Sequence, residues 1–134
     1  MADQATSEVK TFSVDQAQRA LVYVRPILED LRSLFREFTD LREDLADRAL
    51  TADKRGEKID RLEVVKDEII RCSDEIERLG AQVKSFEEGL IDFPYRRPSG
   101  TIVHLCFKLG EEAITHWHET EAGFAGRRPL STLD

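Results

Sequence analysis

The sequence GLIDFPYRRPSGTIVHLCFKLGEEAITHWH, residues 89–118, decides the fold of this chain. It contains three short segments rich in aromatic and β-branched residues, at 90–95, 101–109 and 113–118. The turn-forming sequence RPSG at 97–100 separates the first two segments, and Gly110 opens the turn before the third. Short apolar segments separated by turns predict a small antiparallel β-meander.

The predicted meander has one apolar face and one polar face, because side chains alternate along a strand. The apolar face contains Ile91, Phe93, Val103, Leu105, Phe107 and Trp117. The opposite face contains Asp92, His104, Cys106, His116 and His118. We expect the apolar face to pack against helices.

The lengths of the two turns set the expected register of the strands. They pair Cys106 with His116, His104 with His118, and Asp92 with His104. Neighbouring Cβ atoms across two strands lie roughly 4.5–5.5 Å apart. The side chains on the polar face are therefore expected to lie within reach of one another.

The polar face is a candidate metal site. Imidazoles two residues apart, with a thiolate or carboxylate on the next strand, can converge on one Zn²⁺ or Fe²⁺. The candidate ligands are Asp92, His104, Cys106, His116 and His118. The alternative is a half-solvated sheet face on which these residues have no joint role, and no Cys-x-x-Cys pair supports the metal.

Other polar residues near the end of the chain suggest further sites, each with a plain alternative. Cys106 could act as a nucleophile with a nearby histidine as base, or be a buried, inert thiol. Glu111 could be a site carboxylate or simply face water in its turn. Arg127 and Arg128, with the arginines at 96–97, could bind an anion or pair with surface carboxylates.

An amphipathic helix is predicted over residues 13–49. Ser13 and Gln16 have the spacing of a capping box, in which each side chain accepts from the other's backbone N–H. The apolar stripe of this helix contains Val24, Leu28, Leu31, Phe35, Phe38, Leu41 and Leu45. Pro26 removes one helical hydrogen bond, so we expect the helix to kink or to restart there.

A second amphipathic helix is predicted to follow a polar turn at residues 51–56. Its apolar positions alternate three- and four-residue steps, which is heptad spacing. They are Leu62, Val65, Ile69, Cys72, Ile76 and Leu79, and Cys72 is expected in the core. Gly80 has the position of a glycine that ends a helix. The heptad pattern continues as far as Leu90, so an end near residue 88 is the alternative.

These elements predict an α+β fold, in which a long antiparallel αα-hairpin is followed by a small antiparallel β-meander packed on it. We expect one domain with a frayed N-terminus at 1–11, the hairpin at 12–80, the meander at 81–118 and an irregular tail at 119–134. A two-helix hairpin buries only one seam by itself. We therefore expect a homodimer.

The composition excludes several classes of function. The chain has 134 residues, 35% of them charged, and a net charge of −7. Such an acidic protein is unsuited to nucleic acid or to an anionic membrane surface. No apolar run is long enough for a transmembrane helix, and no signal peptide is apparent. Cys72 and Cys106 are expected to be reduced thiols in the cytoplasm.

Several motifs resemble the bacterial family known as domain of unknown function 2203. They are FSVD at 12–15, VRP at 24–26, GLIDFP at 89–94, LCF at 105–107, GE at 110–111, WH at 117–118 and GFAGRRPL at 123–130. The residues that match the family pattern are Asp92, Cys106, Glu111, Trp117, His118, Gly123 and Arg128. The family usually has an aromatic residue at position 116 and Trp at 107, and His104 is outside its pattern.

The resemblance implies no activity, but it ranks the candidate ligands. A site common to the family would use Asp92, Cys106, Glu111 and His118 in preference to His104 and His116. It also allows Asp92 and His118 to be a hydrogen-bonded pair that only fixes the sheet.

The leading functional hypothesis is a small cytoplasmic accessory or interaction protein that self-associates through its hairpin and is not an enzyme. A protein partner of unidentified nature is part of this hypothesis. The alternative is a protein that depends on a metal or a thiol, with its site around Cys106 and His118. A third hypothesis, an anion pocket built from the arginines, lacks a glycine-rich phosphate loop.

Overall fold

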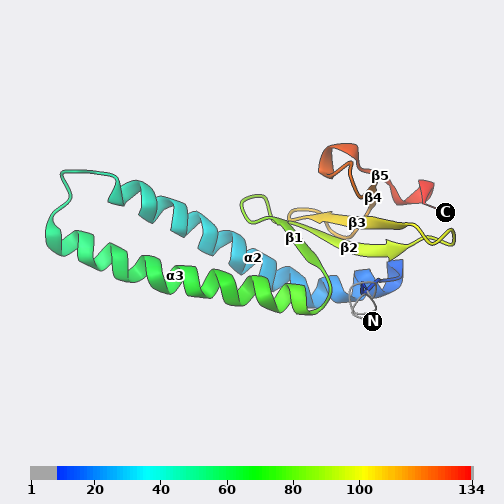
Figure 1. Ribbon diagram of the computed structural model, residues 1–134, viewed down its shortest axis with the longest axis horizontal. Coiled ribbons are helices and arrows are strands. Elements are labelled where there is room, and N and C mark those ends of the chain that lie inside the picture. The colour runs from blue at the N-terminus through cyan, green and yellow to red at the C-terminus, as the bar shows by residue number, and fades with distance from the viewer. Residues whose placement is uncertain (1–8, 134) are drawn as a thin grey trace, which may run out of the picture.

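The structure is a computed structural model that describes residues 9–133. Two long helices, α2 (Val14–Leu45) and α3 (Ala52–Arg78), form a hairpin, and a five-stranded antiparallel sheet lies against one end of it (Figure 1). The predicted α+β fold is therefore confirmed. The N-terminal segment expected to be frayed lies mostly outside the described residues.

Helix α2 begins where the sequence predicted. The Ser13 side chain accepts from the backbone N–H of Gln16 at 3.0 Å, and the Gln16 side chain accepts from that of Ser13 at 2.9 Å. Of the two outcomes predicted at Pro26, a kink or a restart, the restart is wrong, because one continuous helix passes through this residue. Pro26 leaves the carbonyl of Val22 without its helical donor, and Val22 is 76% exposed, so water can reach that turn.

The turn predicted at residues 51–56 is also wrong. The Thr51 side chain caps helix α3, so Ala52 and the residues after it already form its first turns. The helix ends at Arg78, close to the predicted end. Gly80 then adopts φ +103°, a left-handed conformation that glycine reaches without a steric cost.

The sheet is a meander in which every strand lies beside its sequence neighbours. Its strands are β1 (Gln82–Ser85), β2 (Leu90–Arg96), β3 (Ile102–Lys108), β4 (His116–Glu119) and β5 (Arg128–Pro129). The sequence predicted the three central strands but neither edge strand. Two 3-10 helices, η1 (Phe124–Gly126) and η2 (Leu130–Thr132), flank β5 in the segment expected to be irregular.

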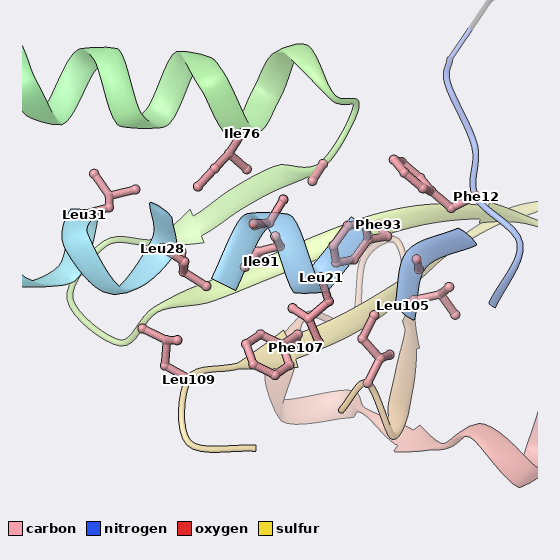
Figure 2. Close-up of a cluster of buried hydrophobic side chains, with 14 of the residues drawn as sticks. Phe12, Leu21, Leu28, Leu31, Ile76, Ile91, Phe93, Leu105, Phe107 and Leu109 are labelled. Carbon is pink, nitrogen blue, oxygen red and sulfur yellow. The ribbon is translucent and has the colours of Figure 1, made fainter. Parts of the chain in front are cut away.

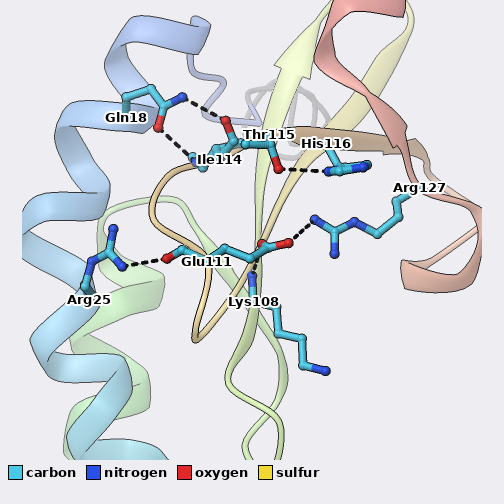
Figure 3. A network of polar contacts seen from close by, with 8 residues as sticks. All are labelled: Gln18, Arg25, Lys108, Glu111, Ile114, Thr115, His116 and Arg127. Carbon is cyan, nitrogen blue, oxygen red and sulfur yellow. Dashed lines mark hydrogen bonds and ion pairs between the residues drawn. The ribbon is translucent and has the colours of Figure 1, made fainter.

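The third predicted strand begins later than expected, because the backbone of Ile114 bonds to helix α2. The Gln18 side-chain amide donates to the carbonyl of Ile114 at 2.9 Å and accepts from its N–H at 3.0 Å (Figure 3). The backbone polar groups of Ile114 are therefore satisfied without a strand partner.

The register between β3 and β4 is as predicted, whereas the register between β2 and β3 is wrong by two residues. Asp92 lies opposite Cys106 and not opposite His104. Strand pairing extends along β2 as far as Arg96, which lies opposite Ile102. The turn is closed by Arg97 N–H, which donates to Thr101 O at 2.8 Å. Because the shift is an even number of residues, every side chain keeps its predicted face.

The predicted apolar face of the sheet is fully buried. Each of its six residues is at most 1% exposed. They pack against Leu21 and Leu28 of α2 and Ile76 of α3 (Figure 2). Phe12 extends this core by lying edge-on to Phe93, at 5.1 Å between ring centroids. Each large apolar side chain contributes about 1.5–3 kcal/mol by leaving water.

The hairpin extends well past the sheet, so its outer half consists of two helices alone (Figure 1). Within residues 9–133 no helix is both long and apolar enough to cross a bilayer.

Candidate metal centre

The outer face of the sheet, turned away from the helices, is buried as well. Asp92 is 2% exposed, Cys106 1% and His118 3%. The segment after β4, which includes η1, covers this face on the side opposite the helices (Figure 1). The alternative of a half-solvated sheet face is therefore wrong for these three residues.

The structure gathers Asp92, Cys106 and His118 into one group. One possible ligand atom from each lies within 4.8 Å of the other two. His118 Nε2 and Asp92 Oδ2 are 3.0 Å apart. Their strands flank β3, so the two side chains meet over the strand that carries Cys106. Ligand atoms around tetrahedral zinc are separated by roughly 3.3–3.8 Å, so the group needs to move by only about 1 Å.

A backbone carbonyl fixes the proton on one nitrogen of His118. Its Nδ1 lies 2.8 Å from the carbonyl oxygen of Glu119. A carbonyl only accepts hydrogen bonds, so Nδ1 must carry a proton and donate it. Histidine ligands in metal sites usually donate their second ring N–H in this way, which orients the ring.

The other nitrogen, Nε2, shares one proton with Asp92. An ionised carboxylate can only accept, and a neutral imidazole with its proton on Nδ1 can only accept at Nε2. The 3.0 Å contact therefore needs one proton between Nε2 and Oδ2, carried formally by His118 or by Asp92. A metal ion could take the place of this proton, because both atoms would offer it a lone pair.

The thiol of Cys106 is protonated near neutral pH. Burial, followed by the negative charge of Asp92, raises its pKa to about 12. A thiol with so high a pKa is a poor nucleophile, which disfavours the thiol-dependent hypothesis. A bound metal ion would reverse this, because a coordinated thiol loses its proton.

The other two predicted ligands lie beside the group and not within it. The ring of His104 stacks on that of His118 at 5.4 Å between centroids. His104 Nδ1 is buried and has no hydrogen-bond partner among residues 9–133. The Nδ1 of His116 lies 2.9 Å from Thr115 Oγ1 (Figure 3). The shifted register explains the place of His104, because it puts Cys106 and not His104 opposite Asp92.

Glu111 ties its turn to the rest of the molecule (Figure 3). Its carboxylate accepts from Lys108 N–H at 2.9 Å and from Arg127 Nη2 at 2.7 Å. Arg25 of α2 donates to the backbone carbonyls of Glu111 and Glu112 at 2.8 and 2.6 Å. Glu111 therefore helps to hold the C-terminal segment over the outer face of the sheet.

Three of the four arginines predicted as an anion clamp lie over two different aromatic rings, and the fourth, Arg96, donates to the carbonyl of Gly100 at 3.1 Å. Arg97 and Arg128 lie 5.3 and 5.2 Å from the centroid of Trp117. Arg127 lies 4.5 Å from the centroid of Phe124. The aromatic contacts thus divide these arginines between two places.

A pocket of about 280 Å³ opens beside the Asp92, Cys106 and His118 group. The group forms its closed end, since these residues have almost no exposed surface. The remaining lining residues are Lys84, Leu90, Thr120, Gly123 and Phe124.

Lys84 could not be predicted as a lining residue, because strand β1 was not predicted. A bulge between Val83 and Ser85 makes Lys84 an extra residue in that strand, and bulges redirect side chains. The motif GFAG at 123–126, which contributed to the family resemblance, was the available signal for Phe124.

The fold and the site define an α+β protein with a long helical hairpin and a buried Asp-Cys-His group beneath a C-terminal cover. A family model described as an uncharacterized conserved protein, domain of unknown function 2203, matches residues 10–130. The chain belongs to this family. Searches of curated proteins and of solved structures returned no match.

Proposed function

We propose that this protein binds a divalent transition-metal ion, Zn²⁺ in the first place. The ligands are Asp92 Oδ2, Cys106 Sγ and His118 Nε2. The observation that carries the proposal is their convergence within 4.8 Å at the closed end of a pocket. The bond from His118 Nδ1 to the carbonyl of Glu119 supports it, because it directs the lone pair of Nε2 towards Asp92.

The charge balance of the group favours a divalent ion. The metal would displace two protons, one from the thiol of Cys106 and one shared by His118 and Asp92. Two positive charges leave and two arrive, so the net charge of the buried site does not change. A buried site with an uncompensated charge would be costly, which disfavours monovalent and trivalent ions.

The ligand set points to zinc and to an open coordination position. One thiolate, one imidazole and one carboxylate form the mixed set that Zn²⁺ accepts, with Fe²⁺ as the next candidate. Structural zinc sites use four protein ligands, whereas three ligands leave a position for water or a substrate. That position would face the pocket, where the ion can polarise a bound group or activate water. A thiolate ligand suits a reducing, cytoplasmic compartment.

Metal content tests the proposal directly. Bound elements are measured in protein purified without chelator. They are measured again in the same protein after zinc addition and desalting. We expect stoichiometric zinc in the wild type and a loss of at least tenfold in zinc affinity for Cys106→Ala and His118→Ala. Cys72→Ala and His116→Ala are matched controls that keep the metal. A wild type that retains no metal after zinc addition would overturn the proposal.

Self-association through the hairpin is a second proposal, and it rests on a separate observation. The outer half of the hairpin has no sheet beneath it (Figure 1). Ile59, Val64 and Ile70 of α3 are 44%, 47% and 52% exposed. A second copy of the chain related by a twofold axis could cover such residues in a four-helix arrangement.

Light scattering on a sizing column tests this second proposal. We expect the wild type to elute as a dimer and Ile70→Glu to shift it towards the monomer. The metal ligands are unchanged in this variant, so its metal content should stay the same. A wild type that is monomeric at about 100 μM would contradict the proposal, since specific dimers form well below this concentration.

A further inference from the structure

The pocket beside the metal ligands has a positive rim in an acidic protein. Lys84 lines it, and no carboxylate among residues 9–133 forms an ion pair with Lys84. Lys108 Nζ lies 5.5 Å from the ring centroid of Phe124, another lining residue. The rim therefore presents cationic groups at the entrance to the buried polar group.

Lys84 lines the same pocket as Asp92, Cys106 and His118. It belongs to strand β1, which pairs with the strand that carries Asp92. Lys84 is thus placed to interact with a negative ligand at the open metal position.

Part of the pocket wall is apolar. Leu90 is 8% exposed and Phe124 is half-buried, and both line the space between the rim and the metal ligands. The volume of about 280 Å³ lies at the lower end for small-molecule sites. A ligand that fits must therefore be small and must combine one charged end with an apolar body.

We propose that this pocket binds a small organic carboxylate, an inference that rests on the metal centre proposed above. The carboxylate lies between the metal ion and Lys84, and the apolar body lies against Leu90 and Phe124. Oxygen from the ligand completes the coordination of the ion. Lys84 supplies the positive charge that compensates the anion, because the ion and its two anionic ligands are already neutral together.

Cobalt reports on the open position, because its visible absorption depends on the number and type of its ligands. The Co²⁺-loaded protein is titrated with benzoate, acetate and the uncharged benzamide. We expect a saturable change with benzoate, tighter binding of benzoate than of acetate, and no change with benzamide. Equal effects of benzoate and benzamide, or equal affinities for benzoate and acetate, would overturn the proposal.

Two lysine variants locate the site. Lys84→Gln should weaken benzoate binding about fivefold and leave cobalt binding unchanged, because only the ligand's counter-charge is lost. Lys66 is an exposed lysine of α3, and Lys66→Gln should change neither benzoate binding nor cobalt binding. Unchanged benzoate affinity in Lys84→Gln would overturn the assignment of Lys84 as the counter-charge of the carboxylate. Failure of the wild type to bind cobalt would instead refute the metal centre itself, so the two failures are distinguishable.

Discussion

The two faces of the central sheet are buried to the same depth, but their chemistry is opposite. On the inner face, Phe107 and Trp117 are at most 1% exposed and belong to the apolar core that packs against the hairpin. On the outer face, Asp92, Cys106 and His118 are 1–3% exposed beneath the C-terminal segment. The same three strands carry both sets.

Burial alone accounts for the composition of only one of the two faces. The inner residues stabilise the fold simply by leaving water. The outer residues lose hydration and must be compensated by pairing, and a buried pair often contributes no net stability. The metal ion proposed above would replace the protons of the outer group and would give this face a function that the inner face does not need.

The largest expected effect is on the inner face. Phe107→Ala should lower the free energy of unfolding by about 4 kcal/mol, because it removes a fully buried ring and leaves a cavity. Urea unfolding measures this loss. The folded fraction of the variant should still bind zinc. A loss below ~1 kcal/mol would mean that the inner face is not the core.

The next effect separates pairing from packing on the outer face. In metal-free protein, His118→Leu should cost about 3 kcal/mol, because Asp92 is left buried without a partner. The double variant Asp92→Leu/His118→Leu should recover most of this loss. Both variants should fail to bind zinc, as titration calorimetry can show. A double variant as unstable as the single one would contradict the pairing of these residues.

The thiol of Cys106 predicts a smaller effect at alkaline pH. Its pKa is raised from 9.0 to about 12, so the folded chain holds this proton more tightly than the unfolded chain. The resulting stability is fully present below pH 9 and is lost as the pH rises towards 12. Urea unfolding of metal-free protein should show a steeper alkaline loss for wild type than for Cys106→Ala. Parallel pH profiles would contradict the raised pKa.

The smallest effect is expected for His116, which shares the outer face but lies outside the ligand group. His116→Ala should change the free energy of unfolding by no more than about 0.5 kcal/mol. Its zinc affinity should equal that of the wild type. A tenfold loss of zinc affinity would show that His116 belongs to the site after all.

The faces of the sheet could be predicted from the sequence because alternation along a strand survives an error in register. Asp92 kept its face although it pairs with Cys106 and not with His104. The exact ligand group could not be predicted, because it depends on where a turn closes. The turn is closed by two backbone hydrogen bonds, from Arg97 N–H to Thr101 O and from Gly100 N–H to Arg97 O. The turn-forming sequence at 97–100 predicts a turn there but does not fix the residue at which strand pairing ends.

The edges of the sheet were harder to predict than its centre. Strand β1 is short and bulged, and its Val83 continues the heptad spacing of helix α3. The sequence therefore gave no indication of Lys84 in the pocket. Strand β5 has two residues and forms only where Arg128 and Pro129 meet β4. Such contacts depend on tertiary structure and leave no periodic pattern.

The most direct test of the metal centre is the absorption spectrum of the protein titrated with Co²⁺. Binding through Cys106 should produce an intense near-ultraviolet band from thiolate-to-cobalt charge transfer, saturating at one ion per chain. The band should be present in Cys72→Ala, whose cysteine lies on the hairpin, and absent from Cys106→Ala. A band that persists in Cys106→Ala, or no band in the wild type, would contradict the proposed centre.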